Sequence, residues 1–99
     1  MSLGVCVKKL KRVDYSMEKI LKALANRRRI AILAYLKKRR EAAVGDISRE
    51  IKLSFKSTSK HLNVLRVVDI VERDQRVLQM FYCLSAKQRP EAGAIIKFL

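Results

Sequence analysis

Polar side chains recur at helical spacing in the middle of this 99-residue chain. Lys56, Lys60 and Asn63 stand at i, i+4 and i+7, which places them on one face of a helix. A lysine ammonium can donate hydrogen bonds to O6 and N7 of guanine, and an asparagine amide can pair with adenine. Such a face is either merely solvated or an interface with base edges in the major groove. The candidate DNA contacts on this segment are Ser54, Lys56, Ser57, Ser59, Lys60, His61 and Asn63.

Residues suited to catalysis or metal binding are scarce. His61 is the only histidine, and Cys6 and Cys83 stand far apart without a CxxC spacing. The sequence has no glycine-rich phosphate loop and no spaced pair of acids on a common helix face. We therefore expect no enzymatic activity, no metal site and no cofactor. For His61 itself, helix packing and a hydrogen bond to a phosphate both remain open.

The charge of the chain is strongly positive and uneven. Lys and Arg number 23 against 9 Asp and Glu, which gives a formal net charge of +14. Residues 1–40 hold 13 basic and 2 acidic side chains. This balance favours a polyanionic partner, although a basic surface that serves only solubility would look similar. No apolar run reaches the length of a membrane span and no signal-peptide core precedes Lys8, so we expect a cytoplasmic protein.

Apolar periodicity predicts four helices before residue 70. The first covers roughly 16–25, and the second follows Asn26 and ends near Arg39. A brief third helix is expected to begin with Asp46 as its cap, and the fourth to run over about 55–67 with Ser54 as its cap. The tight connection between the last two helices is typical of a helix-turn-helix. Three residues should form the buried face of the fourth helix, namely Thr58, Leu62 and Leu65.

The C-terminal third predicts a hairpin and a short final helix. Residues 77–84 alternate as a half-buried strand should, and residues 70–73 can pair with them. Arg73 and Arg76 are the cations of this hairpin and further candidate DNA contacts. Pro90 can open a last helix. The fold class is therefore mainly α with a small β-hairpin, a winged helix-turn-helix over 16–99, preceded by a basic arm over 1–15.

The sequence resembles the ArsR-type family of prokaryotic winged-helix regulators. The likeness rests on LKALANRRRIAIL at 21–33 and LSFKSTSKHLNVLRVVDIV at 53–71. The first stretch is similar to the family's opening of helix two, with Arg29 at the place of its characteristic arginine, and the second is similar to its recognition helix. The resemblance implies a dimer that binds operator DNA, with the first and last helices forming most of the interface.

Several positions depart from that family pattern. Ala43, Val44 and Gly45 replace the Cys-Val-Cys element of the metal-sensing members, and residues 86–99 offer no histidine for a second type of metal site. Val77 stands where the hairpin often has glycine, so the wing must turn without it. Asp69 takes a frequent glycine position, where Asp tolerates a left-handed backbone.

The favoured function is a sequence-specific regulator of transcription that binds duplex DNA as a homodimer and acts as a repressor. A protein-interaction module and a non-specific architectural DNA-binding protein remain as alternatives. An apolar chain end would be exposed in a monomer, which favours dimerisation. The residues expected at the dimer interface are Ile20, Leu24, Ile95, Ile96, Phe98 and Leu99.

Overall fold

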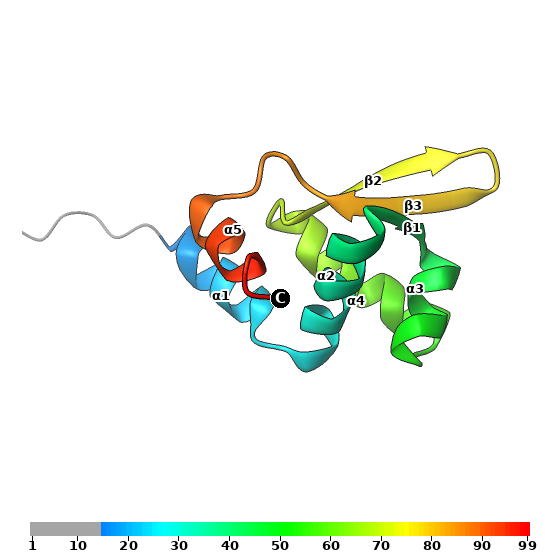
Figure 1. The fold of residues 1–99 in the computed structure, drawn as a ribbon, viewed down its shortest axis with the longest axis horizontal. Coiled ribbons are helices and arrows are strands. Elements are labelled where there is room, and N and C mark those ends of the chain that lie inside the picture. The colour runs from blue at the N-terminus through cyan, green and yellow to red at the C-terminus, as the bar shows by residue number, and fades with distance from the viewer. Residues whose placement is uncertain (1–14) are drawn as a thin grey trace, which may run out of the picture.

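Five helices and three short strands make up the part of the chain that the structure describes. The computed structural model describes residues 15–99, and the predicted arm lies outside them except for Tyr15. Figure 1 follows the chain from one end to the other. The elements are α1 (Ser16–Leu24), α2 (Arg27–Arg39), β1 (Glu41–Ala43), α3 (Val44–Ile51), α4 (Phe55–Val67), β2 (Val71–Arg76), β3 (Gln79–Leu84) and α5 (Pro90–Ile96). None of these helices is both long and apolar enough to cross a membrane.

Two polar side chains fix where α2 and α4 begin. The Asn26 Oδ1 atom accepts hydrogen bonds from the amides of Arg28 and Arg29 at 2.9 and 3.1 Å. The Ser54 Oγ atom accepts one from the Ser57 amide at 3.1 Å, which confirms the predicted cap of α4. Both caps satisfy amides that the first helical turn leaves without a partner.

The predicted cap of α3 was wrong. The helix begins at Val44 with Ala43 at the cap position and no side-chain cap bond. Asp46 lies inside the first turn, where its carboxylate pairs with Arg49. The helix starts earlier because β1 is held by β3 as far as Ala43 and leads directly into it. Asp46 still suits this place, since a negative charge in the first turn interacts favourably with the helix dipole.

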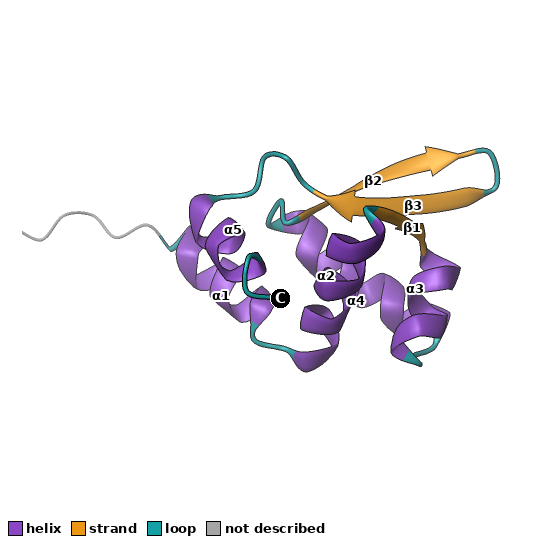
Figure 2. Ribbon diagram, viewed as in Figure 1, coloured by secondary structure: helices purple, strands orange, loops and turns teal. Residues whose placement is uncertain are grey.

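The wing is a three-stranded antiparallel sheet with the order β1-β3-β2, so the predicted hairpin has an additional strand. The hairpin turns at Val77 and Leu78, so the strand begins two residues later than residue 77, and the hairpin extends beyond the helices (Figure 2). A turn at Val77 without glycine was expected. These two apolar side chains are 94% and 91% exposed. Val77 has a φ of 21° and Asp69 a φ of 59°, so both take positive φ values without glycine.

The core lies where α2, α3 and α4 meet the inner face of the sheet. Thr58, Leu62 and Leu65 of α4 are fully buried, as predicted from their spacing. They pack with residues from the other elements, including Ile32, Leu33, Leu36, Ile47, Ile70, Val71 and Tyr82. The winged helix-turn-helix fold is thus present, with α3 and α4 as its two characteristic helices.

The last helix returns to the first. Residues 90–96 pack against residues 16–24 although the two segments are far apart in sequence (Figure 1). The Lys37 Nζ atom reaches from α2 to the end of α5, where it donates to the carbonyls of Ile96, Lys97 and Leu99 at 3.1 Å each. A cation at this end also complements the helix dipole.

Replacing Lys37 with methionine should therefore loosen α5. We expect the free energy of unfolding to fall by about 0.5–1.5 kcal/mol, because hydrogen bonds from an exposed ammonium are worth only that much net. Amide exchange should speed up in residues 95–99 more than elsewhere. Lys38→Met is the matched control, since the Lys38 ammonium makes no hydrogen bond to the described residues. Equal effects of the two substitutions would contradict this role of Lys37.

Candidate nucleic-acid interface

The exposed side of α4 carries polar side chains and no carboxylate, together with the exposed apolar side chains of Phe55, Val64 and Val67. Lys56, Lys60 and Asn63 are exposed, on the side of the helix opposite the buried Thr58, Leu62 and Leu65. The two lysine ammoniums make no ion pair with any described residue. Because α4 is held by its buried face, these side chains are presented on a rigid element. The geometry suits a helix that enters the major groove.

The other polar residues of α4 are partly engaged within the protein. The Ser54 hydroxyl caps the helix, and Ser57 and Ser59 are half-buried. The Asn63 Oδ1 atom accepts a hydrogen bond from the Arg66 Nη2 atom at 2.8 Å. A bidentate pair with adenine also uses that oxygen, and Arg66 already occupies one of its two lone pairs.

His61 is held by an arginine on α2. The Arg29 Nη1 atom lies 3.2 Å from His61 Nδ1. A guanidinium only donates, so Nδ1 must accept and the proton of a neutral ring lies on Nε2. The same guanidinium donates through Nε to the Ala23 carbonyl at 2.6 Å and through Nη2 to the Lys22 carbonyl at 3.4 Å. Arg29 therefore joins the end of α1 to the recognition helix.

Burial lowers the pKa of His61 below its usual 6.5, and the charges of Arg29 and then Arg28 lower it further. The unfolded chain binds this proton more readily, so the resulting stability is complete above about pH 6.5 and is lost as the pH falls through the folded-state pKa. An NMR titration of the single histidine should give a pKa below 6.5, and Arg29→Met should raise it. Lys87→Met is the control. A native pKa at or above 6.5 would exclude this arrangement.

The two wing arginines differ in their surroundings. Arg76 binds both oxygens of Glu41 at 2.8 and 3.0 Å and the Asp74 carboxylate at 2.9 Å, and its guanidinium stacks 4.3 Å from the Phe81 ring centre. Hydrogen bonding to Arg76 lowers the pKa of Glu41, and the two carboxylates raise the pKa of Arg76. The positive charge of Arg76 is therefore largely offset. Arg73 is exposed on β2 and has no such partner among the described residues.

Sequence reasoning did not single out the cations around the start of α2. Arg27 and Arg28 are exposed in the first turn of this helix, which contains no acidic residue, and Lys52 faces them from the end of α3. Cations at a helix N-terminus oppose the helix dipole. Cations without an acid in the first turn of a predicted helix can be recognised in the sequence, and this pattern could have identified the cluster.

The part of the chain that the structure describes contains no cluster of three or more His, Cys, Asp or Glu side chains able to hold a metal. Cys83 is a half-buried free cysteine on β3, and burial together with nearby Glu72 raises the pKa of its thiol. A raised pKa makes a thiol less reactive. Cys6 lies outside the described residues.

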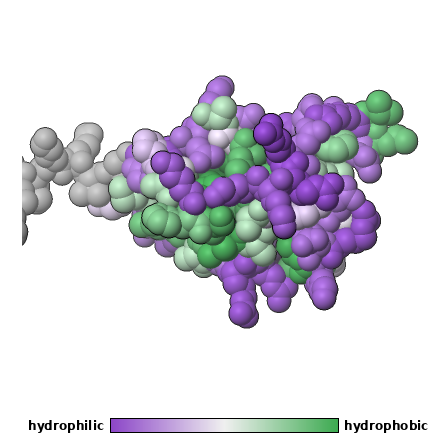
Figure 3. All heavy atoms as spheres, viewed as in Figure 1, coloured by the Kyte–Doolittle hydropathy of each residue, from purple (hydrophilic) through white to green (hydrophobic). Residues whose placement is uncertain are grey.

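The residues expected at a dimer interface separate into two groups. Ile20, Leu24 and Ile96 are buried in the protomer's own core, so they offer a second copy little surface. Ile95, Phe98 and Leu99 remain exposed beside α1. Apolar atoms gather over α1 and α5 in Figure 3, and a second apolar spot marks the tip of the wing. The exposed apolar side chains of the α1–α5 face are Met17, Leu21, Ile95, Phe98 and Leu99.

Helix α3, the exposed helix α4 and the three-stranded wing together define a winged helix-turn-helix DNA-binding protein. Residues 26–73 match the model of the arsR family of bacterial regulatory proteins. The chain is also 38% identical to the transcriptional activator HlyU of Vibrio cholerae over 80 residues, which are 81% of this chain and 70% of that protein. The chain belongs to the ArsR family, whose members are DNA-binding transcriptional regulators and not enzymes.

Solved structures agree with this assignment. Reduced HlyU from Vibrio cholerae superposes with a TM-score of 0.73 at 36% identity, over 85% of this chain and 84% of that one. The transcriptional repressor BigR from Xylella fastidiosa gives 0.69 at 28% identity, over 84% and 78%. The homodimeric winged helix-turn-helix domain of Mb0332 from Mycobacterium bovis gives 0.73 at 24% identity, over 84% and 73%, and supports the fold alone.

Proposed function

We propose that this protein is a cytoplasmic, dimeric repressor that reads a specific operator in duplex DNA through α4. The observation that carries the proposal is the outward face of α4, where Lys56 and Lys60 are exposed and unpaired among the described residues. Two lysines one turn apart suit guanine edges in the major groove. The DNA-binding unit is residues 16–99, and the remaining assigned contacts are Ser54, Ser57, Ser59, His61, Asn63 and Arg73.

Repression is the simpler outcome of this geometry. A dimer bound across a promoter excludes the transcription machinery without any further contact to it. An activator must in addition touch that machinery. HlyU is described as an activator and BigR as a repressor, so both outcomes occur among the relatives.

Electrophoretic competition between genomic fragments and random duplex tests the proposal. A specific regulator retains a small set of fragments against a large excess of random duplex, since specific sites typically bind about 10³–10⁷ times more tightly. An architectural protein would show no preference between fragments. A protein-interaction module would bind neither competitor well. Either of these two results would refute the proposed function.

The proposed dimer uses the α1–α5 face. Its exposed apolar side chains come from α1, from α5, which packs against α1, and from the two residues that end the chain. Such exposed apolar surface on a small protein favours burial against a second copy. Leu21→Glu combined with Ile95→Glu should convert a dimer into a monomer in sedimentation at tens of micromolar protein. Val77→Glu is the matched control, because it places the same charge at another exposed apolar position, the wing tip. A wild-type monomer, or a dimer that survives the double substitution, would show that this face is not the interface.

A further inference from the structure

A groove of about 600 Å³ lies between α2 and α3, within the range of about 300–1,000 Å³ that small-ligand sites occupy. Its floor is formed by Ala31, Ala34 and Ile51, whose small or apolar side chains leave room above α2. None of the exposed polar residues of α4 lines it. The groove is therefore separate from the face assigned to DNA.

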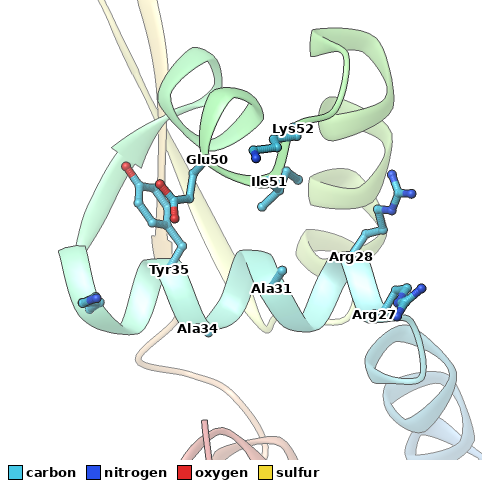
Figure 4. A pocket seen from close by; sticks show the side chains of 9 residues that line it. Arg27, Arg28, Ala31, Ala34, Tyr35, Glu50, Ile51 and Lys52 are labelled. Atoms are coloured by element: carbon cyan, nitrogen blue, oxygen red, sulfur yellow. The ribbon is translucent and has the colours of Figure 1, made fainter.

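The two ends of the groove differ in chemistry, as Figure 4 shows. Arg28 lies at one end with Arg27 just beyond it, and Lys52 lies between Arg28 and Glu50, with its ammonium turned toward the Glu50 side. The Tyr35 ring and the Glu50 carboxylate lie side by side at the other end. Lys38 is a further cation that lines the groove. The arginine end can thus bind an anion, and the other end offers an aromatic ring together with an acceptor of hydrogen bonds.

The positive charges at the cationic end are not neutralised by acidic side chains of the described residues. Arg27, Arg28 and Lys52 form no ion pair with any described residue, and α2 has no acid in its first turn. The helix dipole at this end adds further positive potential. An oxyanion would relieve the repulsion among these groups, and arginine matches the geometry of phosphate oxygens.

The other end selects what is attached to the anion. Tyr35 is half-buried against the core, and Arg39 covers one face of its ring, with the guanidinium carbon 5.6 Å from the ring centre and Nη1 donating to the hydroxyl at 3.5 Å. The ring is therefore held in place, and stacking can use only the face that Arg39 leaves open. Glu50 makes no ion pair with a described residue, and an ionised carboxylate only accepts hydrogen bonds. A flat ring that carries N–H donors would satisfy both side chains at once.

From this arrangement we propose that the α2–α3 groove binds a nucleoside phosphate, with the phosphate at Arg27, Arg28 and Lys52 and the base against Tyr35 and Glu50. A long polyanion such as DNA would need the cations but neither the apolar floor nor the ring. None of the assigned operator contacts lines this groove, so the proposal adds a small-molecule ligand to the protein.

Calorimetry with the full chain and guanosine 5′-monophosphate tests the site. We expect one nucleotide per protomer, with guanosine and inorganic phosphate each binding at least about tenfold more weakly, because each occupies only one end. Arg28→Ala, Lys52→Ala and Tyr35→Leu should each weaken binding by about fivefold or more. Lys97→Ala, an exposed lysine on another surface, should leave it unchanged. Thermal melting of each variant separates loss of the site from loss of the fold.

Four results would overturn the proposal. The first is absence of nucleotide binding up to millimolar concentration, and the second is phosphate binding as tightly as the nucleotide. The third is a loss of nucleotide affinity in Lys97→Ala equal to that in the groove variants. The fourth is displacement of the nucleotide by random duplex DNA whose own binding requires Arg28. The last result would assign the groove to DNA. Operator binding is measured separately and can succeed or fail without affecting this outcome.

Discussion

Leu62→Ala will lower the free energy of unfolding by about 2–5 kcal/mol. Leu62 is fully buried on the inner face of α4, in the cluster with Ile32, Leu33 and Ile47. Removing its side chain leaves a cavity that the surrounding helices fill only in part, and the cost contains both the lost burial and the cavity. Chemical denaturation of the wild type and the variant, analysed with the same m-value, measures the change in the free energy of unfolding.

Lys60→Ala is the matched control for the same helix. Lys60 is exposed and unpaired among the described residues, so the free energy of unfolding should change by less than about 0.5 kcal/mol. If Lys60→Ala destabilised the fold as much as Leu62→Ala, the division of α4 into a core face and a DNA face would be incorrect.

Lys60→Ala will nevertheless cost about 1–3 kcal/mol of binding to the preferred DNA fragment. It removes a donor that can reach a guanine edge, so the loss on random duplex should be smaller and the ratio of the two affinities should fall. Fluorescence anisotropy on both duplexes at one salt concentration measures that ratio. Lys87→Ala, an exposed lysine outside α4, should weaken both duplexes slightly and alike. An equal loss on every sequence for Lys60→Ala would mean that this side chain contacts only phosphates.

Local patterns in the sequence were enough to predict most helices. The spacing of Thr58, Leu62 and Leu65 gave the inner face of α4, and Ser54 gave its start, because both signals act within a few residues. The pairing of β1 with β3 joins Glu41 to Cys83 across the chain, and no local pattern encodes such a contact. The additional strand and the earlier start of α3 both follow from that pairing.

The surroundings of the candidate site were less predictable for the same reason. Arg76 was a candidate DNA contact of the wing, but its main partner Glu41 is 35 positions away in sequence. His61 is held by Arg29, 32 positions away. Ile20 and Leu24 form an apolar stripe, and the sequence alone does not distinguish a stripe that faces the protomer's own core from one that faces a second copy.

Methylation protection of guanine N7 on a retained genomic fragment tests the central claim most directly, because N7 is exposed only in the major groove. A dimer that reads DNA with two copies of α4 should protect two groups of guanines about 10–10.5 base pairs apart, and Lys60→Ala should remove protection at guanines in both groups. A fragment bound tightly with every N7 still reactive, or with protection unchanged by Lys60→Ala, would contradict the assignment of α4 as the reading helix.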